Sequence, residues 1–110
     1  TIREMIVSAV NVVVQAQRLR DGSRRITSIS EIIGMEGDVV ITQEVLGYEV
    51  LGEDSKGKLV GIHKPGDAGN PRFMEKARYY GRQDALAEAL EGLNEHYQTE
   101  KPKLLDRVVR

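Results

Sequence analysis

The sequence predicts an α+β fold: a short N-terminal helix, an antiparallel β-meander of about four strands, and two C-terminal helices. β-Branched runs alternate with Gly-containing turns over the first 63 residues. The longest stretches with helical spacing follow residue 70. Because consecutive strands joined by short turns pair antiparallel, we expect residues 1–63 to form the helix and meander. Residues 64–110 are then a C-terminal helical segment and tail.

The N-terminal half divides at its turn signals. Residues 1–9 have apolar positions at helical spacing, and the β-branched run at residues 10–14 predicts a buried strand. Asp21-Gly22 predicts a tight turn into a second strand over residues 23–33. A second turn at residues 34–38 leads to a third strand. We expect this third strand at 39–51, a turn at 54–57 and a fourth strand at 59–63.

The segment at residues 27–35 allows a second interpretation. Ser28-Ile-Ser-Glu31 matches a capping box, and the isoleucines that follow have helical spacing. A short DNA-recognition helix would show the same capping box and spacing. The strand is favoured because the segment is short, carries no basic residue and is rich in β-branched residues.

The C-terminal part predicts a loop and two helices. Residues 64–70 are rich in Gly, Pro and Asp, and Asn70-Pro71 suits the N-cap and first position of a helix that Gly81 ends. Leu86, Leu90, Leu93 and Tyr97 form one stripe of a second helix over residues 83–98. Pro102 is expected to break this helix and leave residues 103–110 as one more turn or a loose end.

Composition bounds the function. The 110 residues suit one domain or part of a larger one, and the net charge of −1 offers no general field for nucleic acid. There is no cysteine, which excludes disulfides and thiolate metal sites and suits the cytoplasm. The first 25 residues nevertheless carry five arginines against two acids. We hypothesise that the Arg18, Arg20, Arg24 and Arg25 cluster faces an acidic partner, a neighbouring subunit or a nucleotide region.

The sequence motifs that could support catalysis or ligand binding are incomplete. Residues 52–59 nearly spell a phosphate-binding loop, but Leu59 replaces the hydroxyl residue and Glu53 and Asp54 oppose an anion. The context is strand–turn–strand, so a β-turn is predicted instead. His63 and His96 lie on different predicted elements with no metal-ligand spacing. The residues themselves therefore predict no catalytic, cofactor-binding or metal-binding site.

Three stretches resemble a known family. They are Ile-Arg-Glu-Met-Ile at 2–6, Arg-Leu-Arg-Asp-Gly-Ser-Arg-Arg at 18–25 and Gly-Met-Glu-Gly-Asp at 34–38. Together they resemble the C-terminal part of the ATPase domain in secretion and pilus-assembly ATPases of the tight-adherence (CpaF/TadA) branch. The resemblance is close over residues 2–49 and reaches residue 97 more loosely. It implies the C-terminal portion of a RecA-like ATPase core, excised from a longer protein, since the chain begins at Thr1 inside a predicted helix.

The resemblance implies a structural role. The family's phosphate loop, acidic boxes and histidine box have no counterpart here, so this piece needs no cofactor although the parent would use ATP and Mg²⁺. The implied parent is a cytoplasmic hexameric ring, held at the inner membrane by assembly proteins. The implied partners are the rest of that ATPase and other copies, with no nucleic acid expected. The alternatives are a free-standing protein-interaction module or, less favoured, a nucleic-acid-binding domain.

Overall fold

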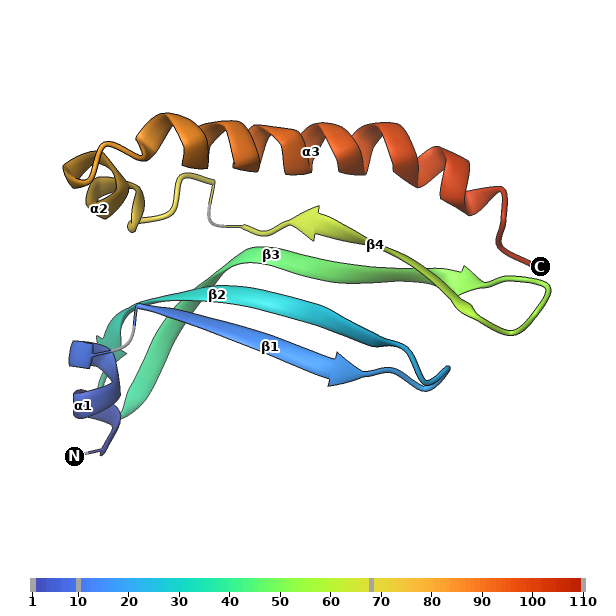
Figure 1. Cartoon of the computed structure of the whole chain (residues 1–110). Coiled ribbons are helices and arrows are strands. Elements are labelled where there is room, and N and C mark those ends of the chain that lie inside the picture. The colour runs from blue at the N-terminus through green and yellow to red at the C-terminus, as the bar shows by residue number, and fades with distance from the viewer. Residues whose placement is uncertain (1, 10, 68, 110) are drawn as a thin grey trace.

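The computed structural model describes residues 2–9, 11–67 and 69–109, with the backbone alone for residues 6–9. Within these residues the predicted α+β architecture is confirmed (Figure 1). A short helix comes first, a four-stranded antiparallel sheet follows, and helices end the chain. The elements are α1 (Ile2–Ala9), β1 (Val12–Arg18), β2 (Arg24–Glu36), β3 (Val39–Glu53), β4 (Leu59–Pro65), α2 (Met74–Tyr79) and α3 (Gln83–Leu105).

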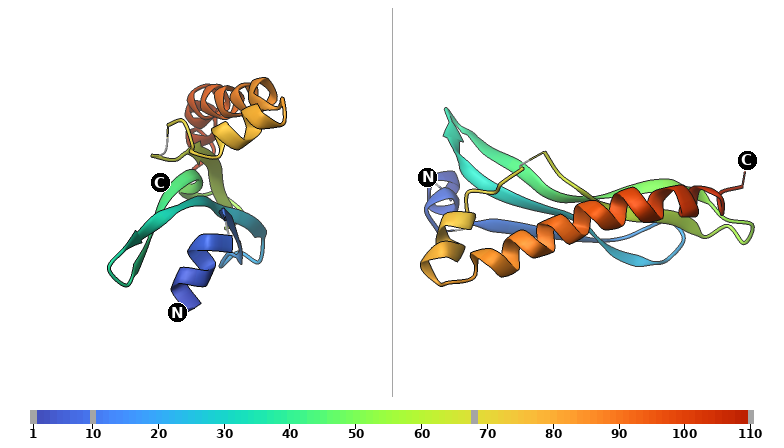
Figure 2. Two further views of the ribbon diagram at one scale, coloured as in Figure 1. Left: turned by 90° about the vertical axis from the view of Figure 1, so that its left-hand side faces the viewer. Right: turned by 90° about the horizontal axis from the view of Figure 1, so that it is seen from above.

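The sheet is a simple meander in the order β1-β2-β3-β4, and each strand is antiparallel to the next. The register is interrupted in every ladder, including between Gln15 and Ala16 and between Val50 and Gly52. Because bulges increase the local twist of a strand pair, the long strands curl instead of forming a flat sheet. Figure 2 shows this curl in the view along the sheet.

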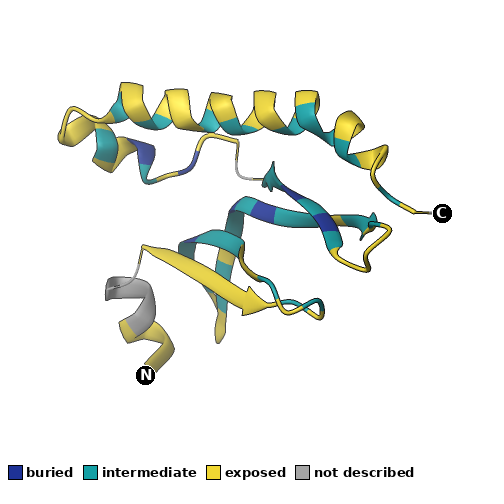
Figure 3. Ribbon diagram, turned by 45° about the vertical axis from the view of Figure 1, so that its right-hand side comes forward, coloured by how far each residue is buried: buried dark blue, intermediate teal, exposed yellow. Residues whose placement is uncertain are grey.

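Helices cover the two sides of the sheet unequally. α3 runs along the sheet over β4 and touches β3, whereas the short α1 lies on the other side against β2 and β3 (Figure 2). The buried apolar side chains of the described residues are Val45, Val60, Ile62 and Met74. They lie on β3, β4 and α2, so the core is concentrated beneath α3, as the burial colours show (Figure 3).

Much of the molecule remains open to solvent. Its accessible surface is 7921 Å², whereas a compact monomer of this mass exposes about 6,100 Å². Its radius of gyration is 16.6 Å, against about 13 Å for a compact domain of this length. The chain therefore exposes roughly 1,800 Å² more than a compact globular monomer would.

The first strand accounts for part of this exposure. The sequence predicts a buried strand at residues 10–14, but β1 begins at Val12 and every one of its residues is exposed. Its three valines keep 36%, 46% and 55% of their surface in water. β1 lies at the edge of the sheet, and in the described part of the chain the helices pack mainly on the other strands. The prediction of burial is wrong because nothing present covers the strand; residue 10 lies outside the described residues.

Two predictions in the N-terminal half are also corrected. Residues 27–35 belong to β2, so the alternative of a recognition helix is wrong. The predicted turn at residues 34–38 is shorter than expected, because Gly34 lies within β2 at a register shift and the turn itself falls at Gly37-Asp38. The other strands match their predicted spans within a few residues.

The helix ends differ from prediction. Asn70 does not cap α2, which begins at Met74 after an N-cap at Phe73 that has no side-chain cap. Pro102 does not break α3, which continues to Leu105. A proline inside a helix removes a backbone hydrogen bond, but Tyr97 and Lys101 just before it are bound to Glu49 of β3. These contacts hold the last turns against the sheet.

Candidate interaction surface

The arginine cluster surrounds the turn between β1 and β2. The turn closes as predicted, with Leu19 N–H donating to the Ser23 carbonyl at 2.8 Å and Gly22 at φ +89°. Asp21 organises it by accepting hydrogen bonds from the Ser23 hydroxyl at 2.6 Å and the Ser23 amide at 2.9 Å. Asp21 also accepts from the Leu59 amide at 2.9 Å, which ties the tip to the start of β4. These bonds, led by those of Ser23, hold the Asp21 pKa well below its ordinary value.

The four predicted arginines do not act as one group. Arg20 pairs with Glu53 at the end of β3 at 2.8 Å, and both side chains are exposed. An exposed pair of this kind contributes little to stability. Its effect is to neutralise one of the four charges within the chain. Arg20 is therefore the member least available to a partner.

The other three arginines lack such a partner. Arg18 and Arg24 lie directly opposite each other in the β1–β2 ladder, and Arg25 comes next on β2. Among the described residues, the side chain of none of the three makes an ion pair or a hydrogen bond. Like charges directly opposite on neighbouring strands are destabilising. The sheet thus holds a cluster of unneutralised positive charge near the end of its first hairpin.

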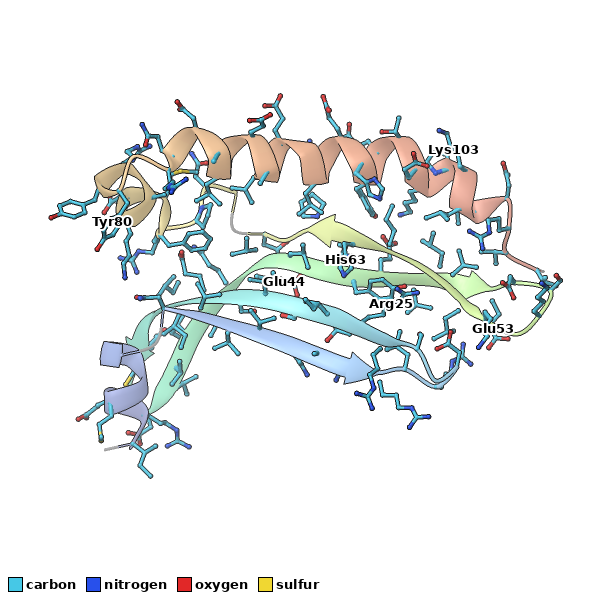
Figure 4. All side chains as sticks on the ribbon, in the orientation of Figure 1. Arg25, Glu44, Glu53, His63, Tyr80 and Lys103 are labelled. Carbon is cyan, nitrogen blue, oxygen red and sulfur yellow. The ribbon has the colours of Figure 1, made fainter. Side chains whose placement is uncertain are left out.

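A groove lies between this cluster and α3. It has a volume of about 500 Å³, and its lining is mostly apolar. His63 Nε2 donates to the Ile26 carbonyl at 2.7 Å, and the His63 ring meets Tyr48 edge-on at 5.0 Å. Figure 4 shows Arg25 and His63 on the same part of the sheet, below α3. The lining residues are Arg24, Arg25, Ile26, Ile29, Leu46, His63, Leu93 and His96.

The two histidines therefore meet at one groove although they lie on different elements, as predicted. His63 is on β4 and His96 is on α3. Among the described residues no group of three or more His, Cys, Asp or Glu side chains could hold a metal ion. Their common surroundings are apolar side chains and two arginines. The groove is suited to binding an apolar group with a negative charge.

Two carboxylates of the sheet bind the C-terminal part of the chain. Glu31 of β2 is 2% exposed and accepts hydrogen bonds from Gln43 Nε2 at 2.8 Å and from the amides of Arg72 and Phe73 at 2.8 and 2.7 Å. Glu31 thus satisfies the amides before α2 that Asn70 was predicted to serve. Sequence reasoning missed it because 41 residues separate Glu31 from Arg72.

The second carboxylate is Glu49 of β3. It accepts a hydrogen bond from the Tyr97 hydroxyl and pairs with Lys101 Nζ at 3.0 Å, while Lys101 also lies 4.9 Å from the Tyr97 ring centre. The Tyr97 bond first, then the Lys101 ammonium, lowers the Glu49 pKa. The hydrogen bond that Lys101 Nζ donates to the Tyr97 hydroxyl at 2.8 Å, followed by its bond to Glu49, raises the Lys101 pKa. This triad joins α3 to the sheet beyond the groove.

The segment that resembles a phosphate loop is a turn, as predicted. Residues 54–58 connect β3 to β4, and Asp54 accepts hydrogen bonds from the amides of Lys56 at 2.9 Å and Lys58 at 3.0 Å. These bonds lower the Asp54 pKa. A strand follows the turn, so no helix N-terminus points at the place a phosphate would take. In the described part of the chain no helix is long and apolar enough to cross a membrane.

Comparison of the chain with protein-family models finds no match, and comparison with curated proteins finds no significant relative. The resemblance to secretion ATPases therefore rests on the three sequence stretches at residues 2–6, 18–25 and 34–38.

Proposed function

We propose that this chain is the C-terminal part of the ATPase domain of a secretion or pilus-assembly ATPase of the tight-adherence branch. In this proposal it supplies sheet strands and subunit contacts and leaves nucleotide chemistry to the rest of the protein. The sequence stretches at residues 2–6, 18–25 and 34–38 support the family. The boundary predicted near residue 63 remains part of the proposal.

The observation that carries the proposal is the unfinished sheet. β1 is exposed along its whole length and lies at an open edge. The chain as a whole exposes roughly 1,800 Å² beyond a compact monomer of its mass. Stable protein interfaces bury about 1,200–2,000 Å² in total, or about 800 Å² on each partner. An excess of this size is expected of a piece that normally packs against further polypeptide.

The proposal assigns partners and a place. The partners are the rest of the parent ATPase, other copies in a hexameric ring, and assembly proteins at the inner membrane, with the ring in the cytoplasm. Catalysis, ATP and Mg²⁺ belong to the parent and not to this piece. With a net charge of −1, nucleic acid is not an expected partner.

The test is made on the parent gene. The reading frame upstream of Thr1 should encode a phosphate-binding loop, and the polypeptide it encodes should bind the separately purified 110-residue chain. Binding should reduce hydrogen exchange at the amides of β1. An upstream frame with no nucleotide-binding motif, or a Met-initiated gene of about this length, would reject the motor assignment.

The alternative is a free-standing protein-interaction module. The arginine-lined groove favours this alternative, because such a groove could bind a partner protein without the rest of an ATPase. The upstream reading frame separates the two functions. A phosphate-binding loop upstream favours the ATPase, and a Met-initiated gene of about this length favours the module.

A further inference from the structure

The groove beneath α3 combines an apolar floor with a positively charged rim. Its floor is formed by Ile26, Ile29, Leu46 and Leu93, which are exposed or half-buried. Its rim carries Arg24 and Arg25, whose side chains have no ion pair or hydrogen bond among the described residues. Apolar pockets with a few convergent polar groups are typical binding sites.

The charge at the rim identifies the group that would bind. Arg24 lies opposite Arg18 in the ladder, so an anion near Arg24 relieves a like-charge repulsion. A guanidinium binds a carboxylate through parallel N–H bonds, with geometry that a neutral amide cannot reproduce. The apolar floor requires an aliphatic group next to that carboxylate.

The extent of the open surface indicates the size of the occupant. A small amphiphile would cover the groove, but it would leave most of the roughly 1,800 Å² excess exposed. β1, which is exposed along its length, pairs directly with β2, which carries Arg24 and Arg25. A polypeptide can cover both surfaces at once.

We propose that the groove between α3 and β2 binds a polypeptide segment in which an acidic residue adjoins aliphatic ones. The carboxylate pairs with Arg24 and Arg25, and the aliphatic side chain packs on Ile26 and Leu93. This inference goes beyond the proposed function, because a peptide of this chemistry should bind the 110-residue chain whatever the activity of the parent.

The experiment is an amide NMR titration of the ¹⁵N-labelled chain with the peptide acetyl-Leu-Glu-Leu-Leu-Glu-Leu-amide. Shifts should concentrate at residues 24–29 and at Leu93 and His96. The same peptide with glutamine in place of glutamate should bind at least tenfold more weakly. The double variant Arg24→Gln/Arg25→Gln should weaken binding at least tenfold, and Ile26→Thr should weaken it measurably.

The control is Arg78→Gln, which removes an exposed arginine from α2 and should leave binding unchanged. Equal binding of the glutamate and glutamine peptides would overturn the proposal, as would shifts located away from the groove. Decanoate supplies the same chemistry from a free amphiphile. Tighter, arginine-dependent binding of decanoate than of the glutamate peptide would overturn the assignment to polypeptide.

Discussion

Replacing Glu31 with glutamine tests how the C-terminal helices are held to the sheet. The Glu31 carboxylate is 2% exposed and accepts three hydrogen bonds, two at Oε1 and one at Oε2. Glutamine has nearly the same shape, so it can keep the two bonds at its carbonyl oxygen. Its NH₂ group then replaces Oε2 and faces the Phe73 amide, donor against donor.

This geometry sets the expected loss of stability in Glu31→Gln. One charge-assisted hydrogen bond is lost, and a donor that was satisfied in a buried place is left without an acceptor. We expect Glu31→Gln to lower the free energy of unfolding by about 2–3 kcal/mol. That is a large part of the about 5–15 kcal/mol that stabilises an ordinary domain.

The assay is urea denaturation followed by circular dichroism, combined with hydrogen exchange at the amides of Arg72 and Phe73. Both amides should exchange faster in the variant. Glu36→Gln is the matched control, because Glu36 is exposed at the end of the same strand. A loss under about 0.5 kcal/mol, typical of a surface substitution, would refute the reasoning, as would unchanged protection of both amides.

Three further predictions follow from named contacts. Because the Glu49 pKa is lowered in the folded chain, Glu49 contributes stability above the ordinary glutamate pKa of about 4.3 and loses it as the pH falls through the lowered value. Acid unfolding should therefore be less steep for Glu49→Gln than for the unmodified chain, and equal slopes would contradict this. Asp21→Asn should speed hydrogen exchange of the Leu59 amide, whereas an unchanged rate would show that the bond to Asp21 does not hold the hairpin tip. The open β1 edge should make the chain self-associate at high micromolar concentration in sedimentation equilibrium, and Val13→Lys should suppress this; a strictly monomeric unmodified chain would count against it.

Local signals predicted most of the fold. The Asp21-Gly22 turn, the β-branched runs and the stripe from Leu86 to Tyr97 depend on residues close in sequence, and each appears where expected. The stripe is only half-buried, which helical spacing by itself does not reveal. The spacing of apolar residues predicts which side of a helix faces the protein. It does not predict how deeply that side is buried, because burial depends on the other elements of the fold.

The errors arose where distant residues decide the outcome. Asn70 looked like a cap because the sequence nearby offered nothing better, yet the amides before α2 bind Glu31. Pro102 looked like a break because the bonds of Tyr97 and Lys101 to Glu49 span about half the chain. The valines of β1 looked buried because their burial depends on a neighbour that the described residues do not supply.

The sequence predicts the arginine cluster of the candidate surface but not the groove beside it. The sequence at 18–25 predicts a cluster of arginines, but the ion pair that sets Arg20 apart from the other three depends on Glu53. The groove could not be predicted, because it brings β2, β3, β4 and α3 together. His63 and His96 gave no signal for it, since no local spacing relates them.

The central proposal is that this chain is a structural part of a nucleotide-driven ATPase and that the residues which bind and hydrolyse ATP lie elsewhere in the parent protein. Isothermal titration of the purified 110-residue chain with Mg·ATP, followed by a phosphate-release assay, tests it most directly. The account predicts no saturable binding up to about 1 mM, the upper end of ordinary enzyme KM values, and no phosphate release above background. Micromolar binding with turnover would contradict it.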